Sequence, residues 1–436
     1  MTDYLRYYYE QKEAIDARIA ADTEKHRKAD AVLRVTDAAG KPLRASVTLK
    51  QTSHSFQFGC NIFMLDQFPD EEHNAEYRRK FPELFNYAIV PFYWSDYEVE
   101  EGKPRVGLDA PNVYRRPAPE KVLQYTKEHR LGTKGHCLMW QLFLPEWLTE
   151  DKEQNMRYLE RRISQIAKEY GDRIPDFDIV NETISRKPYH VSEPKIPFDC
   201  PNRTFAYADS VMPNNRLFIN DTTKSSWCHF NREHSGYYLH IENLLLKGRR
   251  IDAIGMQYHI FVKPEDLEKD LELYLNPTRL LDSLDYYGRF ERPIHISEIT
   301  VPAYADRANS NEEQAEIAEL LYRLWFSHPS VEAIIWWNLV DGTAAYAPLG
   351  TNEGENYYRG GLLNYDMTEK PVYQTLKRLI KEEWTTALSA DVFGDYRFRG
   401  FCGDYDVTVT TPDGKTHNGH FALSGTDGNE WVMVCQ

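Results

Sequence analysis

The sequence lacks the features that mark membrane, secreted or metal-stabilised proteins. No stretch approaches the 18 consecutive apolar residues of a membrane span, and the first residues lack the apolar segment of a secretory signal. The six cysteines are scattered without a CxxC pair or zinc-finger spacing, so neither a disulfide framework nor a structural zinc site is predicted. We therefore expect no membrane partner and a cytoplasmic protein, or a secreted one if a signal peptide has been removed.

An excess of basic charge is also missing. The chain has 52 Lys and Arg against 67 Asp and Glu, a formal net charge of −15, so binding of nucleic acid through phosphate neutralisation is not expected. What the chain does have is length, 436 residues, and an aromatic content of 13%. This length suits one large barrel with a smaller domain, and aromatic rings can pack against sugars as well as in a core.

The hydrophobic pattern divides the chain into a central α/β region and two terminal segments. Residues 1–54 are predicted to form an amphipathic helix and a β-hairpin, and residues 388–436 short antiparallel strands. Because a lone hairpin is marginal in water, we expect the two ends to combine into one small β-sandwich. Residues 55–387 alternate β runs with helical stretches, which predicts an α/β fold, a (β/α)8 TIM barrel. The expected strands are residues 56–60, 87–90, 135–139, 176–180, 217–220, 253–257, 294–297 and 333–337.

Polar residues follow most of these strands, and two strand ends carry a carboxylate, Glu182 and Glu298. In such barrels the reacting groups lie at the carboxyl ends of the strands. Hydrolysis of a glycosidic bond needs one protonated carboxyl and one ionised carboxyl, so the pair predicts a glycoside hydrolase with both residues as catalytic groups. The other strand ends supply candidate substrate-binding residues: His136, Trp140, Gln141, Asn181, Asn220, Gln257, His259 and Trp337.

Two other classes of protein compete with this interpretation. A metal-dependent hydrolase on the same barrel needs a His-x-His at the first strand, which instead ends Phe58-Gly59-Cys60-Asn61, so no metal and no cofactor are expected. A non-catalytic carbohydrate-binding barrel stays open as an alternative. Loss of either Glu182 or Glu298 would indicate it, and both residues are present.

Over roughly residues 55–385 the chain resembles glycoside hydrolase family 10, the endo-β-1,4-xylanase family. Six motifs in the family's order carry the resemblance. They are Gly135-His136-Cys137-Leu138-Met139-Trp140, Asp178-Ile179-Val180-Asn181-Glu182, Phe218-Ile219-Asn220-Asp221, Gly255-Met256-Gln257-Tyr258-His259, Ser297-Glu298-Ile299-Thr300 and Trp337.

The resemblance implies cleavage of a β-1,4-linked xylan-type polysaccharide or oligosaccharide by double displacement, with retention. Glu298 would be the nucleophile and Glu182 the acid/base, their carboxyls about 5–5.5 Å apart. It further implies that His259 orients Glu298, that Gln257 and Asn181 contact the sugar 2-hydroxyl or hold the carboxylates, and that Trp337 stacks on a sugar ring. A carbohydrate substrate is the expected partner, and the oligomeric state is not predicted.

The chain departs from the family pattern where the sugar is recognised. Gln141 stands where a His is usual, and Tyr93 and Trp94 stand in a segment that usually supplies Asn and Lys. Tyr346 lies in the stretch that replaces a second Trp after the eighth strand. We therefore expect Tyr93, Trp94 and Tyr346 to contact the substrate and unsubstituted xylan to be a poor one. A different or decorated β-linked plant oligosaccharide is the alternative substrate.

Overall fold

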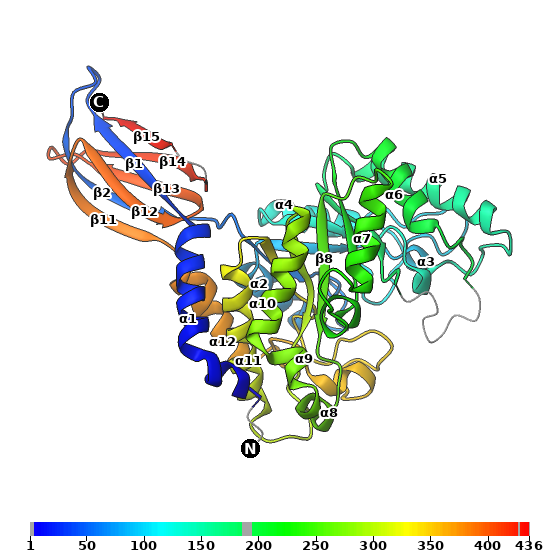
Figure 1. Ribbon diagram of the computed structural model, residues 1–436. Helices are drawn as coiled ribbons and strands as arrows, with labels where there is room; N and C mark the ends of the chain where they lie inside the picture. Colours follow the sequence, from blue (N-terminus) through cyan, green and yellow to red (C-terminus); the bar gives the residue numbers. More distant parts are fainter. Residues whose placement is uncertain (1–3, 185–193, 426–427, 436) are drawn as a thin grey trace.

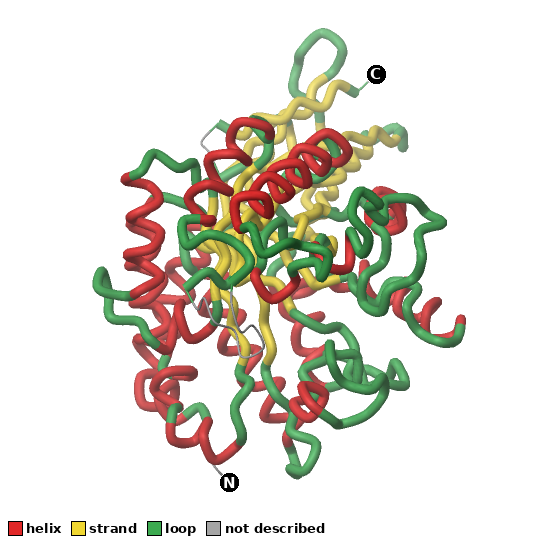
Figure 2. The backbone as a smooth tube through the Cα atoms, turned by 90° about the vertical axis from the view of Figure 1, so that its right-hand side faces the viewer, coloured by secondary structure: helices red, strands yellow, loops and turns green. Residues whose placement is uncertain are grey.

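Eight parallel strands close into a barrel within a shell of helices (Figures 1 and 2). The structure is a computed structural model that describes residues 4–184, 194–425 and 428–435. Around the barrel the strands follow the order β10-β3-β4-β5-β6-β7-β8-β9, so each strand lies beside the next one in the chain. Their bounds are β3 (Gln57–Asn61), β4 (Tyr87–Pro91), β5 (Gly132–His136), β6 (Asp176–Asn181), β7 (Arg216–Asp221), β8 (Ala253–His259), β9 (Ile294–Thr300) and β10 (Val331–Trp336).

The barrel strands form where the sequence has short runs of apolar residues. β4 and β9 are buried at every residue, as expected of parallel strands that are covered on both faces. The predicted (β/α)8 barrel is confirmed. One strand is displaced from its predicted position, because β5 ends at His136 rather than at Met139. After β5 the chain runs beside β6, where the backbone N–H groups of Leu138 and Met139 donate to carbonyls of that strand.

Helices cover the outside of the barrel, and α5 (Lys152–Tyr170) shows why they form. The Asp151 carboxylate accepts the backbone N–H groups of Glu153 and Gln154 at its start, and apolar residues recur along the face that is buried. No helix in the described ranges is long and apolar enough to cross a bilayer. The other helices of the barrel are α2 (Glu71–Leu84), α3 (Trp94–Tyr97), α4 (Pro119–Glu128), α6 (Cys200–Val211), α7 (Gly236–Leu246), α8 (Pro264–Lys269), α9 (Leu271–Leu275), α10 (Pro277–Tyr287), α11 (Ser310–Ser327) and α12 (Pro371–Arg378). Short 3-10 or π turns are η1 (Gln141–Phe143), η2 (Lys224–Cys228), η3 (Gly288–Phe290), η4 (Gly354–Tyr358) and η5 (Leu379–Glu383).

The two ends of the chain form two further sheets beside the barrel (Figure 1). One sheet has the order β12-β1-β15 and the other β11-β2-β13-β14. Their apolar faces share a core that includes Leu33, Leu49, Tyr405 and Trp431. The strands are β1 (Lys28–Thr36), β2 (Arg44–Gln51), β11 (Ala387–Phe393), β12 (Asp395–Phe401), β13 (Gly403–Thr410), β14 (Thr416–Leu423) and β15 (Asn429–Val434).

The predicted N-terminal hairpin is wrong, because β1 and β2 lie in different sheets. β1 pairs with β12 and β15, whereas β2 pairs with β11 and β13. Alternation of apolar and polar residues shows that one face of a strand is buried, but it does not identify the neighbouring strand. The segment between β1 and β2 therefore crosses from one sheet to the other. The residue limits of the terminal domain stay a prediction.

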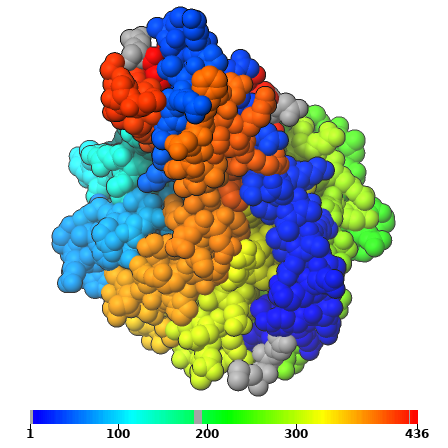
Figure 3. Space-filling model, turned by 90° about the vertical axis from the view of Figure 1, so that its left-hand side faces the viewer, coloured from blue at the N-terminus to red at the C-terminus, as the bar shows by residue number. Residues whose placement is uncertain are grey.

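The amphipathic helix at the N-terminus, α1 (Arg6–His26), lies along the barrel helices α10 and α11 (Figure 3). Arg18 pairs with Asp285 of α10 at 3.0 Å. Just after the helix, the Arg27 guanidinium donates to the backbone carbonyl of Val331 at the start of β10 (2.7 Å). These contacts fix the direction in which the chain leaves α1 and enters the first strand of the terminal sheets.

Candidate active site

Four neighbouring strands, β6 to β9, bring five of the predicted residues together at their carboxyl ends. Asn181 ends β6 and Glu182 follows it, Asn220 lies in β7, Gln257 in β8 and Glu298 in β9. Asn181, Asn220 and Gln257 are at most 2% exposed, and Glu298 is 5% exposed. Buried polar groups of this kind need partners, and here they partner one another.

Glu298 is held by donors on both of its carboxyl oxygens. Asn220 Nδ2 donates to Oε1 at 2.9 Å, and His259 Nε2 lies 3.1 Å from Oε2. Ser297 Oγ donates to Asn220 Oδ1 at 2.6 Å, which sets the orientation of the Asn220 amide. The two hydrogen bonds therefore fix the direction of the Glu298 carboxyl group.

Glu182 has a different environment. Its backbone has a φ of 53°, in the left-handed region that residues with a side chain seldom adopt, at the point where the chain leaves β6. Gln257 Nε2 donates to Glu182 Oε1 at 3.1 Å, and the Trp140 side chain also donates to this carboxyl. Burial and the nearby charge of Glu298 raise the pKa of Glu182 to about 8. Glu182 therefore keeps its proton at neutral pH.

Two histidines complete the surroundings of Glu298. His259 Nδ1 lies 2.9 Å from Thr300 Oγ1, so a second contact fixes the ring that binds Glu298. His136 Nδ1 lies 2.8 Å from Asp178 Oδ2, while its Nε2 lies 3.9 Å from Glu298 Oε1. Lys134 pairs with Asp178 at 3.1 Å. Burial by itself would raise the pKa of Asp178, but Lys134 and His136 together hold this pKa below its ordinary value.

Trp337, which follows β10, presents its ring beside both histidines. The ring centroids of His136 and His259 each lie 5.8 Å from that of Trp337, with edge-to-face geometry. Phe63 contacts the same ring at 5.5 Å. Trp337 is 9% exposed, so a small part of its surface faces solvent.

The remaining predicted residues lie in different places, and only some of them are beside the carboxylates. Tyr93 packs its ring against His136 and Trp140, at centroid distances of 5.4 and 5.7 Å, and so borders the site. Trp94 does not join it: its ring is buried in the main core, and its indole N–H donates to Glu98 at 2.9 Å. Gln141 is buried at the start of η1.

Tyr346 is 81% exposed, and its ring stacks on that of Phe143 with the ring centroids 6.1 Å apart and the planes tilted by 27°. This places Tyr346 over the aromatic cluster that contains Tyr93, so the tyrosine side chain extends the border of the site outwards.

Several residues around the carboxylates were not predicted. Phe261 stacks on His259 at a centroid distance of 4.6 Å. Asn338, directly after Trp337, accepts a hydrogen bond from Arg115 at 2.9 Å. The position of Asn338 at a strand end was a signal that could have identified it, whereas Arg115 comes from a long loop without a local motif. The unpredicted set is Arg115, Phe261, Ser297, Thr300, Asn338 and Glu355.

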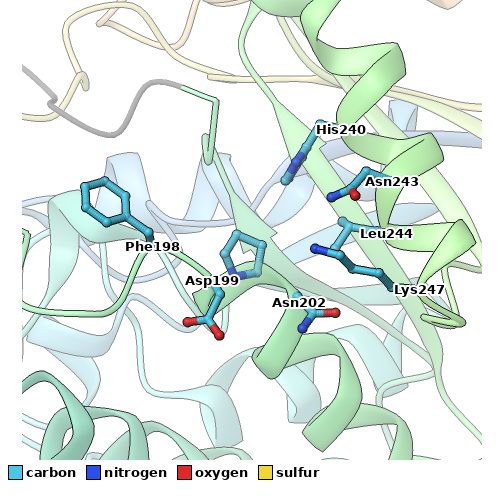
Figure 4. A pocket seen from close by; sticks show the side chains of 8 residues that line it. Phe198, Asp199, Asn202, His240, Asn243, Leu244 and Lys247 are labelled. Carbon is cyan, nitrogen blue, oxygen red and sulfur yellow. The ribbon is translucent and has the colours of Figure 1, made fainter.

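A hollow lies apart from the carboxylates, between α6 and α7 (Figure 4). Its volume is about 250 Å³. His240 projects from α7 into it, and its Nε2 lies 3.1 Å from Thr183 Oγ1, the residue after Glu182. The residues that line it are Phe198, Asp199, Pro201, Asn202, His240, Asn243, Leu244 and Lys247. Among the residues that the structure describes, no group of three His, Cys, Asp or Glu is placed to hold a metal ion.

A parallel barrel with two neighbouring carboxyls at its carboxyl face, Glu298 buried and Glu182 partly exposed, has the arrangement of glycoside hydrolase barrels. The sequence model of "Glycosyl hydrolase family 10" matches residues 99–379, well over half of the chain. The chain therefore belongs to glycosyl hydrolase family 10, and the resemblance read from the six motifs is confirmed.

Two relatives in sequence have names that describe different activities. The chain is 24% identical to "Anti-sigma-I factor RsgI6" of Acetivibrio thermocellus, over 90% of this chain and 46% of that protein. It is also 24% identical to "Endo-1,4-beta-xylanase 1" of Arabidopsis thaliana, over 94% of this chain and 39% of that one. The chain thus spans less than half the length of these relatives.

Solved structures share the fold of the barrel. Xylanase 10B from Thermotoga maritima has a TM-score of 0.59 at 20% identity, covering 76% of this chain and 96% of that one. Xylanase 10B from Thermotoga petrophila, in complex with xylobiose, has a TM-score of 0.58 at 21% identity, covering 76% and 95%.

Proposed function

We propose that this protein is a retaining glycoside hydrolase that cleaves a β-1,4-linked xylan-type polysaccharide or oligosaccharide, with Glu298 as nucleophile and Glu182 as acid/base. The observation that carries the proposal is the unlike environment of the two carboxyls. Glu182 has a raised pKa of about 8, whereas His259 and Asn220 donate to Glu298. One protonated and one charge-stabilised carboxyl is the combination that glycoside hydrolysis needs.

In the first step, Glu298 Oε attacks the anomeric carbon while the bond from that carbon to the leaving oxygen breaks. Glu182 transfers its proton to the leaving oxygen, so the departing alcohol is neutral and Glu182 becomes a carboxylate. His259 and Asn220 direct the attacking carboxylate, because each is itself fixed, by Thr300 and Ser297 respectively.

In the second step, a water oxygen attacks the anomeric carbon of the glycosyl-enzyme ester and forms a new bond to it. Glu182, now ionised, accepts the proton of this water, and the bond between the anomeric carbon and Glu298 breaks. The product keeps the β configuration, because two inversions occur in succession. Both carboxyls return to their starting protonation states, and the cycle uses no cofactor.

The substrate class rests on the names of relatives and on the family. Relatives named endo-1,4-beta-xylanase occur in Arabidopsis thaliana and Thermotoga neapolitana, each 24% identical to this chain. A non-catalytic barrel is the second candidate, because one relative is named as an anti-sigma factor and not as an enzyme. The retained pair Glu182 and Glu298 favours the hydrolase.

The experiment compares Glu298→Ala and Glu182→Ala on xylan and on 4-nitrophenyl β-xylobioside. Glu298→Ala should abolish turnover of both, whereas Glu182→Ala should lose far more activity on xylan than on the aryl glycoside, whose leaving group needs little protonation. Proton NMR of the first product should show the β anomer. Equal losses on the two substrates would contradict the acid assignment, and a first product in the α form would contradict retention. No hydrolysis of any β-glycoside by the wild type would leave the non-catalytic candidate.

A further inference from the structure

Glu355 is a third carboxyl group at the proposed active site. It belongs to η4 (Gly354–Tyr358), in the segment that connects β10 to α12. Asn338, the residue after Trp337, donates a hydrogen bond to its carboxyl. In the proposed reaction Glu182 and Glu298 are the carboxyls that take part in bond making and proton transfer, and Glu355 has no role in these steps.

The hydrogen bonds of Asn338 explain how the Glu355 carboxyl is held in place. Asn338 Oδ1 accepts from Arg115 Nη1 at 2.9 Å and lies 3.4 Å from Asn61 Nδ2. The amide oxygen is therefore occupied by donors, and the amide nitrogen is left to donate to Glu355. Arg115 is 2% exposed and also donates to the carbonyl of Thr343. A buried cation thus fixes the amide that in turn orients the carboxyl.

The surroundings of Glu355 place it next to the histidine that holds Glu298. Glu355 lines a small cavity of about 10 Å³ together with Phe261 and Thr300. Phe261 stacks on His259, and Thr300 binds its Nδ1. Burial raises the pKa of Glu355, Arg115 opposes this shift, and the charge of Glu298 adds to it. Glu355 is therefore within electrostatic reach of the nucleophile while it remains partly exposed.

We infer that Glu355 determines which sugar the site accepts next to Trp337. One carboxyl oxygen is engaged by Asn338, and the other accepts a hydrogen bond from a hydroxyl group of the bound sugar. In its ionised form the Glu355 carboxyl is an acceptor without a donor, and a second anion beside this form in a site of low dielectric is strongly disfavoured. The substrate class is therefore a β-glycoside whose sugar in this subsite is neutral, and a sugar that carries a carboxylate there is rejected. This inference rests on the proposed function.

The test compares Glu355→Gln with Glu353→Gln. Glu353 lies two positions earlier in the same loop, is exposed, and makes no capping hydrogen bond with its side chain, so it is a matched control. The probes are 4-nitrophenyl β-xylobioside and a pair of xylo-oligosaccharides, one unsubstituted and one bearing a glucuronate branch. Both kcat/KM and the Kd of the oligosaccharides, by calorimetry, are measured for each variant.

Glu355→Gln should lower kcat/KM on the neutral aryl glycoside about 10- to 100-fold, since the sugar hydroxyl then donates to a neutral amide oxygen and no longer to a charged carboxylate. It should also raise preference for the glucuronate-bearing oligosaccharide over the neutral one by about 10-fold or more, because the repulsion is removed. Glu353→Gln should leave both values unchanged. If Glu355→Gln does not fold, Glu355→Asp should lose affinity for the neutral sugar yet still reject the charged one.

An unchanged preference between the two oligosaccharides in Glu355→Gln would overturn the inference, whatever happens to overall activity. The proposed function fails separately, if the wild type hydrolyses none of the probes. In that event the same two Kd values still decide on Glu355, because rejection of an anionic sugar does not depend on turnover.

Discussion

Replacing Glu182 by glutamine should change how the stability of this protein depends on pH. The wild-type carboxyl is buried beside Glu298, and its pKa is raised from the ordinary value of 4.5 to about 8. Between these two values the folded protein holds a proton that the unfolded chain has released. The free energy of unfolding must then decrease as pH rises through this window, because the folded state binds more protons than the unfolded state.

The shift sets the size of the effect. Each pKa unit corresponds to about 1.36 kcal/mol, so Glu182 should cost about 3 kcal/mol of stability at pH 7 and about 5 kcal/mol once the pH exceeds 8. Glutamine has nearly the same shape, can accept a hydrogen bond from Gln257 or Trp140, and carries no charge. The variant should therefore be close to the wild type near pH 4 and more stable by several kcal/mol at pH 8.

Urea unfolding at pH 4.5, 6, 7 and 8, followed by tryptophan fluorescence, measures this difference. Glu150→Gln is the control, because Glu150 is exposed and should give a curve parallel to the wild type. Parallel pH dependences for Glu182→Gln and the wild type would refute the reasoning, since the carboxyl would then titrate alike in the folded and unfolded states. The measurement needs no substrate, so it tests the site independently of the proposed activity.

Two further predictions concern the scaffold. Lys134→Met should lower the free energy of unfolding by about 3–5 kcal/mol at pH 7, because it removes the cation beside the buried Asp178 carboxylate and leaves only the contact with His136. The pKa of Asp178 is lowered in the folded state, so the stabilisation from its ionised form is lost as the pH falls through this lowered pKa. The difference between variant and wild type in urea unfolding should therefore shrink in acid. A difference below about 1 kcal/mol at pH 7 would contradict the pairing. Removal of residues 388–436 should expose the apolar faces of β1 and β2 and lower the melting temperature, whereas an unchanged melting curve would show that these strands do not depend on the C-terminal ones.

The features of the fold that depend on local pattern could be predicted from the sequence. A barrel strand buried on both faces is a short apolar run, and the polar residue at its end is adjacent in sequence. The carboxylates Glu182 and Glu298 follow this rule, so their strands and their common edge of the barrel were accessible without a structure. The partners of β1 and β2 were not accessible, because β12 and β15, which pair with β1, and β11 and β13, which pair with β2, all lie at the other end of the chain.

Trp94 illustrates a second limit. It follows Tyr93 directly, and both residues lie just after β4, so the sequence places them equally close to the site. Tyr93 packs against His136, but α3 begins at Trp94 and turns its ring into the main core, where Glu98 accepts its N–H. Successive residues at the start of a helix point in directions about 100° apart, so neighbours in sequence are not neighbours in a site.

The proposed division of labour between the two carboxyls depends on residues that are distant in the sequence. Glu182 and Glu298 have the same local signature, a polar residue at the end of a buried strand. His259 comes from β8 and Asn220 from β7, and both donate to Glu298, whereas Gln257 and Trp140 donate to Glu182. Because β8 and β9 are adjacent and parallel, Gln257 and Glu298 are paired in register. The donors that distinguish a proposed acid from a proposed nucleophile are therefore set by strand register. A change of one residue in the register of β8 would turn His259 away from Glu298, since successive side chains of a strand point to opposite faces.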